Sequence, residues 1–196
     1  MSHDTFSINQ QMAQFDHLDS VWLFGYGSLI FKPDFPYLAR QAASIRGWSR
    51  RFWQGSHDHR GTFERPGRVV TLIQDSAASC AGMAYLITPE VFSHLDYREK
   101  NGYLRFASEM QLADGRLEVG LVYIATEENA AFLGAADEAA IARQIAQAQG
   151  PSGSNREYLL KLAQSLRELG QIDEHVFGLE KLLLEVSSES AYSARA

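Results

Sequence analysis

The spacing of apolar residues changes part-way along this chain of 196 residues, and the change limits its possible folds. From Val21 to Ala125, apolar residues alternate with polar ones or form short runs bounded by turn residues, as they do in β-strands. From Asp137 onward they recur at the spacing of one helix face. Strands first and helices last predict an α+β fold rather than alternating α/β units. We expect about five or six strands, in a strongly bent mixed sheet or partly closed β-barrel with C-terminal helices.

The strand predictions rest on short apolar segments. We expect one strand from Val21 and a second over 43–56, bent near Gly47. Residues 68–74 and 80–87 predict two further strands, joined by a small polar turn.

A hairpin and several helices complete the predicted elements. Asp114-Gly115 is typical of a type I′ turn, which predicts a hairpin between 103–112 and 117–125. Ser154 and Glu157 stand three residues apart, as in a capping box at the start of a helix. The expected helices are 88–97, 137–149, the segment after Ser154, and 173–186.

Composition and periodicity divide the chain into three parts. Residues 1–20 show weak periodicity and predict a variable N-terminal arm, which is either a disordered tail or a short docked helix. Residues 21–186 are expected to form a single domain. Residues 187–196 are rich in serine and alanine and predict a frayed tail.

The net charge, the cysteine count and the lengths of the apolar runs disfavour several classes of protein. A net charge of −6 without a long basic run argues against nucleic acid or a membrane surface as partner, and nothing indicates an obligate protein partner. Cys80 is the single cysteine, so no intrachain disulfide or thiol pair can form, which fits the cytoplasm. No apolar run approaches the length of a membrane span, and residues 1–20 lack the regions of a signal peptide.

The first predicted strand runs directly into Gly25-Tyr26-Gly27-Ser28. Glycines here allow positive φ and let a ligand approach the backbone closely. Successive N–H groups in such a turn can form a cradle for a carboxylate or a similar anion. An ordinary strand and turn is the alternative, because an isolated glycine motif is a weak signal.

The sequence motifs of several common binding and catalytic sites do not match this chain. Residues 25–27 lack the third glycine and the following helix of a dinucleotide site. Residues 150–155 lack the lysine of a phosphate-binding loop, and Ser28 lacks the glycine of a nucleophile elbow. His57 and His59 could bind a metal, but no third ligand is evident, so we expect none.

Glu99 is the carboxylate that the pattern favours as a base. It lies at the expected C-terminus of a helix, where the helix dipole should raise a carboxyl pKa, and burial would raise the pKa further. Such a group suits general base catalysis near neutral pH. The alternative is a solvent-exposed ion pair with Lys100, Arg98 or Arg51.

Six stretches together resemble the ChaC family of glutathione-specific γ-glutamylcyclotransferases, over roughly residues 21–184. They are Phe24-Gly25-Tyr26-Gly27-Ser28-Leu29-Ile30, Arg50-Arg51-Phe52-Trp53-Gln54-Gly55, His59-Arg60-Gly61, Pro66-Gly67-Arg68-Val69-Val70-Thr71-Leu72, Leu95-Asp96-Tyr97-Arg98-Glu99-Lys100 and Gly150-Pro151-Ser152-Gly153. The Tyr26-Gly27-Ser28-Leu29 part of the first stretch is shared by the wider cyclotransferase superfamily, whereas the second and fifth stretches resemble the ChaC family in particular. Phe31 stands where members often have tryptophan, which keeps an aromatic ring.

The resemblance implies a bent-sheet cyclotransferase fold with glutathione as substrate. The α-amine of the γ-glutamyl group would attack its own γ-carbonyl and release 5-oxoproline and Cys-Gly, without a cofactor, metal or enzyme nucleophile. Glu99 would be the general acid/base. The γ-glutamyl group would bind at Leu23, Phe24, Gly25, Tyr26, Gly27 and Ser28. The arm and the tail should not touch the site.

Two more residues are candidates for substrate binding. Arg51, Arg60 or Arg68 could hold the glycine carboxylate of glutathione, and of these we favour Arg51. Tyr158 could reach the pocket from a helix or could pack in the core. Two other functions stay open: a cyclotransferase for other γ-glutamyl amino acids or amines, and a non-catalytic regulator of cation transport.

Overall fold

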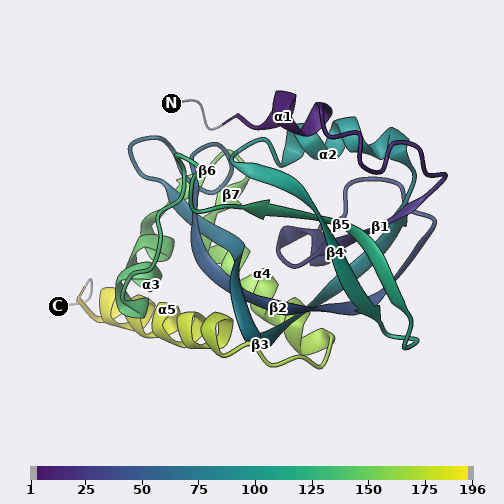
Figure 1. Ribbon diagram of the computed structural model, residues 1–196. Helices are drawn as coiled ribbons and strands as arrows, with labels where there is room; N and C mark the ends of the chain where they lie inside the picture. The colour runs from purple at the N-terminus through teal and green to yellow at the C-terminus, as the bar shows by residue number, and fades with distance from the viewer. Residues whose placement is uncertain (1–3, 194–196) are drawn as a thin grey trace. The chain divides into compact units, whose positions relative to one another are not determined.

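The computed structural model describes the backbone of residues 4–193 and the side chains of residues 4–186 (Figure 1). The chain forms two compact units. The first contains the residues up to Arg50 together with Thr71–Phe132, and the second contains Arg51–Val70 and the residues from Leu133 onward. Two long strands run from one unit into the other.

Five strands form a closed barrel in the order β1-β3-β2-β4-β5, which confirms an α+β fold with a mixed sheet. The strands are β1 Val21–Gly25, β2 Ala39–Ser56, β3 Gly67–Ile87, β4 Tyr103–Leu112 and β5 Leu117–Ala125. β1 pairs antiparallel with β3 and parallel with β5, so that Leu23 lies opposite Tyr85 and Leu121. A strand with neighbours on both sides is buried along its length, which explains its continuous apolar sequence.

The strands β2 and β3 are longer than predicted. Gly47 has a φ of +81°, which confirms the predicted bend in β2. The predicted turn over 75–79 is wrong, because β3 is continuous there. Its polar residues find partners within the sheet: Ser49 of β2 donates to the Asp75 carboxylate at 2.8 Å. Cys80 is buried, as a core residue should be.

The hairpin of β4 and β5 is confirmed, but its turn type is wrong. Gly115 has a φ of +89°, whereas no residue other than glycine has a positive φ in the described part of the chain. A type I′ turn needs positive φ at both central residues, which excludes it for Asp114. The Asp114 carboxylate instead accepts a hydrogen bond from the N–H of Arg116 at 3.1 Å.

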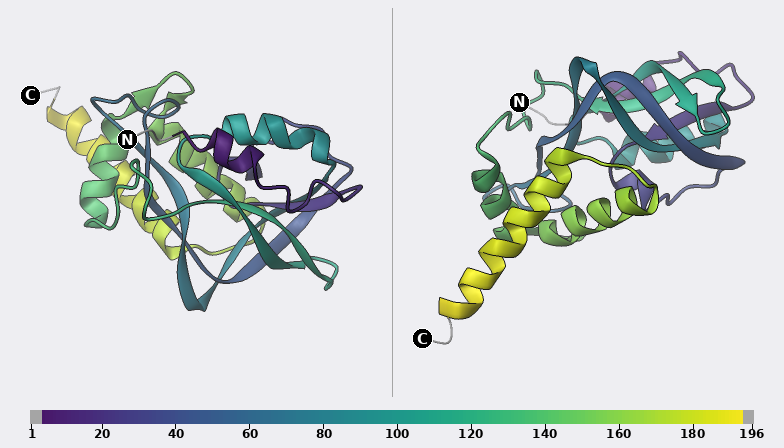
Figure 2. Two further views of the ribbon diagram at one scale, coloured as in Figure 1. Left: turned by 45° about the horizontal axis from the view of Figure 1, so that its top comes forward. Right: turned by 90° about the horizontal axis from the view of Figure 1, so that it is seen from below.

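Two helices of the first unit lie side by side (Figures 1 and 2). A 3₁₀ turn, η2 Pro89–Val91, leads into α2 Phe92–Arg98, close to the predicted bounds. The N-terminal arm forms α1 Phe6–Gln10. Of the two alternatives predicted for the arm, the structure therefore shows the short docked helix.

The second unit holds the C-terminal helices, which the helical spacing predicted. They are α3 Glu138–Gln147, α4 Asn155–Glu168 and α5 Glu174–Ser193, and a short hairpin of β6 Gln149–Gly150 and β7 Gly153–Ser154 precedes α4. Asp137 and Ser154 cap α3 and α4 by accepting hydrogen bonds from backbone N–H groups. α5 continues past Val186 to Ser193, into the stretch for which the sequence predicts a tail, and residues 194–196 lie outside the described part. Among the described helices, none is long and apolar enough to cross a bilayer.

Candidate functional site

The large side chains around the turn after β1 are buried. Leu23 and Phe24 are almost fully buried, with 0% and 1% of their surface exposed. Tyr26 is also buried, and its hydroxyl donates to the carbonyl of Tyr123 at 2.8 Å. These three predicted substrate-binding residues therefore support the turn from within. The 3₁₀ turn η1 Ser28–Ile30 follows them.

The predicted positive φ at the two glycines of the turn is wrong, and Gly25 instead serves close packing. Neither Gly25 nor Gly27 is among the glycines with positive φ; Gly27 has a φ of −125°. A Cβ on Gly25 would lie 2.6 Å from the Cβ of Leu29. A Cβ on Gly82, in the neighbouring strand β3, would lie 2.3 Å from the carbonyl oxygen of Gly25. The turn thus folds tightly back on its own strand.

Three N–H groups at the far side of the turn already have acceptors. Those of Phe31 and Lys32 donate to the carbonyl of Ser28, and that of Ile30 donates to Gly27. An anion at the turn would therefore have to be bound by N–H groups that precede Ile30.

Buried groups outside the motif hold the turn in place. Arg50 is 2% exposed, and its Nε donates to the carbonyl of Tyr26 at 2.6 Å. The hydroxyl of Tyr85 donates to the carbonyl of Leu29 at 2.7 Å, and burial raises the pKa of Tyr85 to about 12. The sequence analysis did not predict this role for either residue. Arg50 stands in one of the family stretches, as a basic residue within an apolar strand.

Glu99 lies at the C-terminal cap of α2, as predicted, and it is largely shielded from solvent. Its side chain is 16% exposed, and Oε1 lies 3.2 Å from Nε of Arg98, whose side chain is 13% exposed. The predicted alternative of an ion pair with Arg98 is therefore correct, but its placement in open solvent is wrong.

Arg98 connects Glu99 to the turn. One terminal nitrogen donates to the Ser28 hydroxyl at 2.9 Å, and the other donates to the carbonyl of Lys32 at 2.9 Å and pairs with Asp34. Burial alone would raise the pKa of the Asp34 carboxyl, but the nearby Arg98, and then His94, hold that pKa below its usual value. The guanidinium group thus joins the predicted acid, the turn and the loop after it.

A buried ion pair supports α2 just before Glu99. Asp96 is 1% exposed and accepts hydrogen bonds from Arg105, at 2.8 Å from Nε, and from the Tyr123 hydroxyl at 2.6 Å. Burial, and then the Asp96 carboxylate, raise the pKa of Tyr123, so this hydroxyl stays a donor. The guanidinium of Arg105 also stacks over the ring of Phe92, 4.4 Å from its centre.

Arg51 and Tyr158 lie in the second unit, whereas the turn and Glu99 lie in the first. Tyr158 is 5% exposed and packs edge-on against Phe52, with ring centres 5.9 Å apart. This burial agrees with its core-packing alternative. Burial lowers the pKa of the His175 imidazole, and the positive charge of Arg51 lowers it further. Arg51 therefore lies near His175.

Arg60 and Arg68 bind protein groups. Arg60 donates to Glu157 at 3.0 Å and to the carbonyl of Ser154 at 3.2 Å. Arg68 donates to Gln144 at 2.7 Å and to the carbonyl of Gly134 at 2.9 Å. Both guanidinium groups therefore bind other groups within the second unit.

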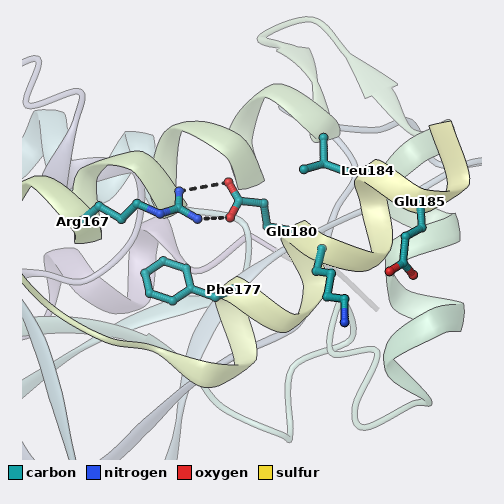
Figure 3. Close-up of a pocket in the computed structure, with 6 residues that line it drawn as sticks. Arg167, Phe177, Glu180, Leu184 and Glu185 are labelled. Atoms are coloured by element: carbon teal, nitrogen blue, oxygen red, sulfur yellow. Dashed lines mark hydrogen bonds and ion pairs between the residues drawn. The ribbon is translucent and has the colours of Figure 1, made fainter. Parts of the chain in front are cut away.

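The predicted site residues form no metal centre among the described residues, and they do not line the pocket between α4 and α5. Among the described residues, no three histidine, cysteine or acidic side chains are grouped to hold a metal ion. A pocket of about 550 Å³ lies in the second unit, between α4 and α5 (Figure 3). Its lining residues are Arg167, Phe177, Glu180, Lys181, Leu184 and Glu185.

The family is decided by a comparison with known protein families. The model described as "ChaC-like protein" matches residues 21–186. This chain belongs to the ChaC-like family. The match contains the turn, Arg98 and Glu99, and it begins after the arm.

The ChaC-like chain is similar to several named proteins. It is 43% identical to glutathione-specific gamma-glutamylcyclotransferase 1 of Danio rerio, over 84% of this chain and 89% of that protein. It is 42% identical to gamma-glutamylcyclotransferase 2-3 of Arabidopsis thaliana, over 87% and 92%. The crystal structure of a glutathione-specific γ-glutamyl cyclotransferase from yeast has a TM-score of 0.79 and 33% identity, over 86% of this chain and 97% of that one. The ChaC-like chain thus has the cyclotransferase fold.

Proposed function

We propose that this chain is a glutathione-specific γ-glutamylcyclotransferase, which converts glutathione to 5-oxo-L-proline and L-cysteinylglycine. The observation that carries the proposal is the shielded Glu99 carboxylate, which Arg98 links to the Ser28 hydroxyl of the turn. The names of the relatives in Danio rerio and Saccharomyces cerevisiae support glutathione as the substrate.

The proposed reaction moves protons from the attacking nitrogen to the leaving nitrogen. Glu99 takes a proton from the α-ammonium group, and the free amine attacks the γ-carbonyl carbon of the same molecule. The new carbon–nitrogen bond closes the lactam ring, and the bond to the cysteine nitrogen breaks. Two of the three ammonium protons end on the cysteine amine, and Glu99 carries them as base and then as acid.

Binding supplies most of the remaining catalysis. The amine and the carbonyl belong to one molecule. Holding such groups in the reactive orientation can lower the activation free energy by about 7–11 kcal/mol. The N–H groups before Ile30 bind either the α-carboxylate or the developing oxyanion. Arg98 lies 3.2 Å from the Glu99 carboxylate and donates to the Ser28 hydroxyl, so it holds the proposed acid/base beside the turn.

The reaction calls for no cofactor, because the substrate contains its own nucleophile. We further propose that residues 21–186 act as one functional domain in the cytoplasm. Substrate contacts by Arg51 and Tyr158 stay predictions. A net charge of −6 supports a small-molecule partner rather than nucleic acid.

One assay tests the substrate. The purified protein is incubated separately with glutathione and with γ-glutamyl-alanine, and 5-oxoproline and the released amine are measured. We expect release from glutathione and at most a trace from γ-glutamyl-alanine. The second substrate matters because it keeps the γ-glutamyl group and lacks the Cys-Gly part of glutathione. Equal rates would favour the broader cyclotransferase, and no 5-oxoproline from either would favour a non-catalytic protein.

A further inference from the structure

The N-terminal arm contacts the turn that directly follows Glu99. Asp4 forms a β-bridge with Asn101, and the N–H of Thr5 donates to the carbonyl of Lys100 at 2.8 Å. The family match begins at residue 21, so the arm lies outside it. The sequence led us to expect that the arm does not touch the site, and these contacts reach Lys100 and Asn101, the two residues that follow Glu99.

Two buried polar side chains of the arm hold this turn. The Thr5 hydroxyl lies 3.0 Å from the carbonyl oxygen of Lys100 and 2.7 Å from that of Tyr103, so its one proton serves either acceptor in turn. Asn9 is 0% exposed; its amide nitrogen donates to the Tyr103 carbonyl at 2.8 Å, and its oxygen accepts from the N–H of Arg105 at 3.1 Å. The arm thus satisfies carbonyl groups on both sides of the turn.

Backbone hydrogen bonds within the turn add to the contacts of the arm. The N–H of Tyr103 donates to the carbonyl of Glu99 at 3.3 Å, and that of Gly102 donates to the carbonyl of Lys100 at 2.9 Å. Gly102 has a φ of +89°, which glycine adopts at little cost. The hydrogen bonds from the arm to Lys100 and Tyr103 therefore support the same turn from outside.

The rest of the arm strengthens the same contact. Met12 accepts a hydrogen bond from Arg105 through its carbonyl at 3.3 Å, and Asp16 lies 3.6 Å from the same guanidinium. The ring of Phe6 packs edge-on against Tyr97, with centres 6.3 Å apart. α1 accordingly lies along α2, the helix that ends at Glu99 (Figures 1 and 2).

We infer that the arm is a clasp that positions the proposed general base, with Thr5 and Asn9 as its positioning residues. The inference rests on the proposed function of Glu99. Proton transfer depends on placing the carboxylate against the amine, and a displacement of about 1 Å can cost about 10²-fold in rate. The side-chain hydrogen bonds of Thr5 and Asn9 go to Lys100, Tyr103 and Arg105. A change at either residue should therefore disturb Glu99 more than substrate binding at the turn after β1.

Matched substitutions in the full-length protein test the clasp. Thr5→Val removes the hydroxyl and keeps the shape, Thr5→Ser keeps the hydroxyl, and Gln10→Ala changes an exposed residue of the same helix. We expect Thr5→Val to lower kcat about tenfold with KM within about twofold, because only proton transfer is disturbed. Thr5→Ser and Gln10→Ala should stay near wild type. Amide hydrogen exchange at Gly102 and Tyr103 should accelerate in Thr5→Val alone.

The outcomes separate this inference from the proposed function. Unchanged exchange at Gly102 and Tyr103, or faster exchange with unchanged kcat, overturns the clasp. If the wild-type protein releases no 5-oxoproline from glutathione, the proposed function is wrong. Hydrogen exchange at Gly102 and Tyr103 then shows by itself whether the arm holds the turn after Glu99. All assays are run well below the measured Tm of each variant. If Thr5→Val does not fold, Asn9→Asp replaces it, since it removes the donor to Tyr103 and keeps the acceptor for Arg105.

Discussion

At the scale of single residues, the proposed site depends on one acid and on the arginine beside it. The sequence could predict Glu99 because its position at a helix end and the family motif are both local features. It could not predict what Arg98 does, because Ser28 and Lys32 lie far away in the chain and reach Arg98 only in the folded unit. The same holds for Arg50, whose carbonyl partner is Tyr26.

Glu99→Gln should abolish most turnover and leave the fold intact. The amide has nearly the same shape but cannot accept the ammonium proton, and general acid–base catalysis contributes about 10²–10⁴-fold. The measurement is kcat for 5-oxoproline release from glutathione, with Tm as the check on folding. Glu128→Gln, at an exposed glutamate, is the control. Near-normal kcat in Glu99→Gln would remove Glu99 as the base.

Arg98→Lys should lower kcat/KM about 10- to 100-fold although it keeps the positive charge. A lysine is a compact point charge and cannot contact Glu99, Ser28 and Asp34 together, as the planar guanidinium does. The matched control is Arg116→Lys, at an arginine that pairs with Asp114 on the surface. If the two variants had the same kcat/KM, Arg98 would not be linking the acid to the turn.

At the scale of elements, tertiary contacts overrode local signals in two places. The polar stretch 75–79 has the composition of a turn, yet it continues β3 because β2 offers it partners such as Ser49. The weakly periodic arm becomes a helix because Thr5 and Asn9 find acceptors on the turn after α2. The sequence could predict neither, since both depend on groups distant in the chain.

Gly25→Ala should destabilise the turn after β1. The added methyl group would lie 2.6 Å from the Cβ of Leu29, and overpacking of this kind costs about 1–3 kcal/mol. The turn must shift to relieve the contact, so KM for glutathione should rise as well. Urea unfolding gives the free energy, and steady-state kinetics give KM. Ser76→Ala, at an exposed position of β3, is the control; a Gly25→Ala protein as stable as this control would contradict the close packing.

At the scale of the whole molecule, the sequence predicted the α+β class with its C-terminal helices, but it did not predict which strands pair. Strand and helix periods indicated α+β, while the order β1-β3-β2-β4-β5 and the parallel pairing of β1 with β5 emerge only from the folded chain. Stability to acid is also a property of the whole fold, and His175 contributes to it. Its side chain is 8% exposed, Nε2 accepts from the N–H of Phe52 at 3.1 Å, and Nδ1 lies 3.0 Å from Glu138.

His175 should make the protein less stable below about pH 6.5. Burial lowers its pKa in the folded state from the ordinary 6.5, so the unfolded chain binds the proton first as the pH falls. The contribution of the neutral imidazole is therefore complete above pH 6.5 and is lost below it. Urea unfolding between pH 7.5 and pH 5, in steps of about half a unit, should show a shallower acid loss in His175→Gln than in wild type. His17→Gln, at an exposed histidine, should keep the wild-type slope; identical slopes in all three proteins would exclude His175.

By itself, the sequence determined the α+β class, the strand that leads into the turn, the capped helices and the acid at the end of α2. These features depend on apolar spacing and on short motifs, which are local in the chain. Only the tertiary structure decided that Gly25 serves packing, that Arg98 joins Glu99 to Ser28, and that the arm holds the turn beyond Glu99. Each of these is a contact between distant segments, and closure of the barrel brings such segments together.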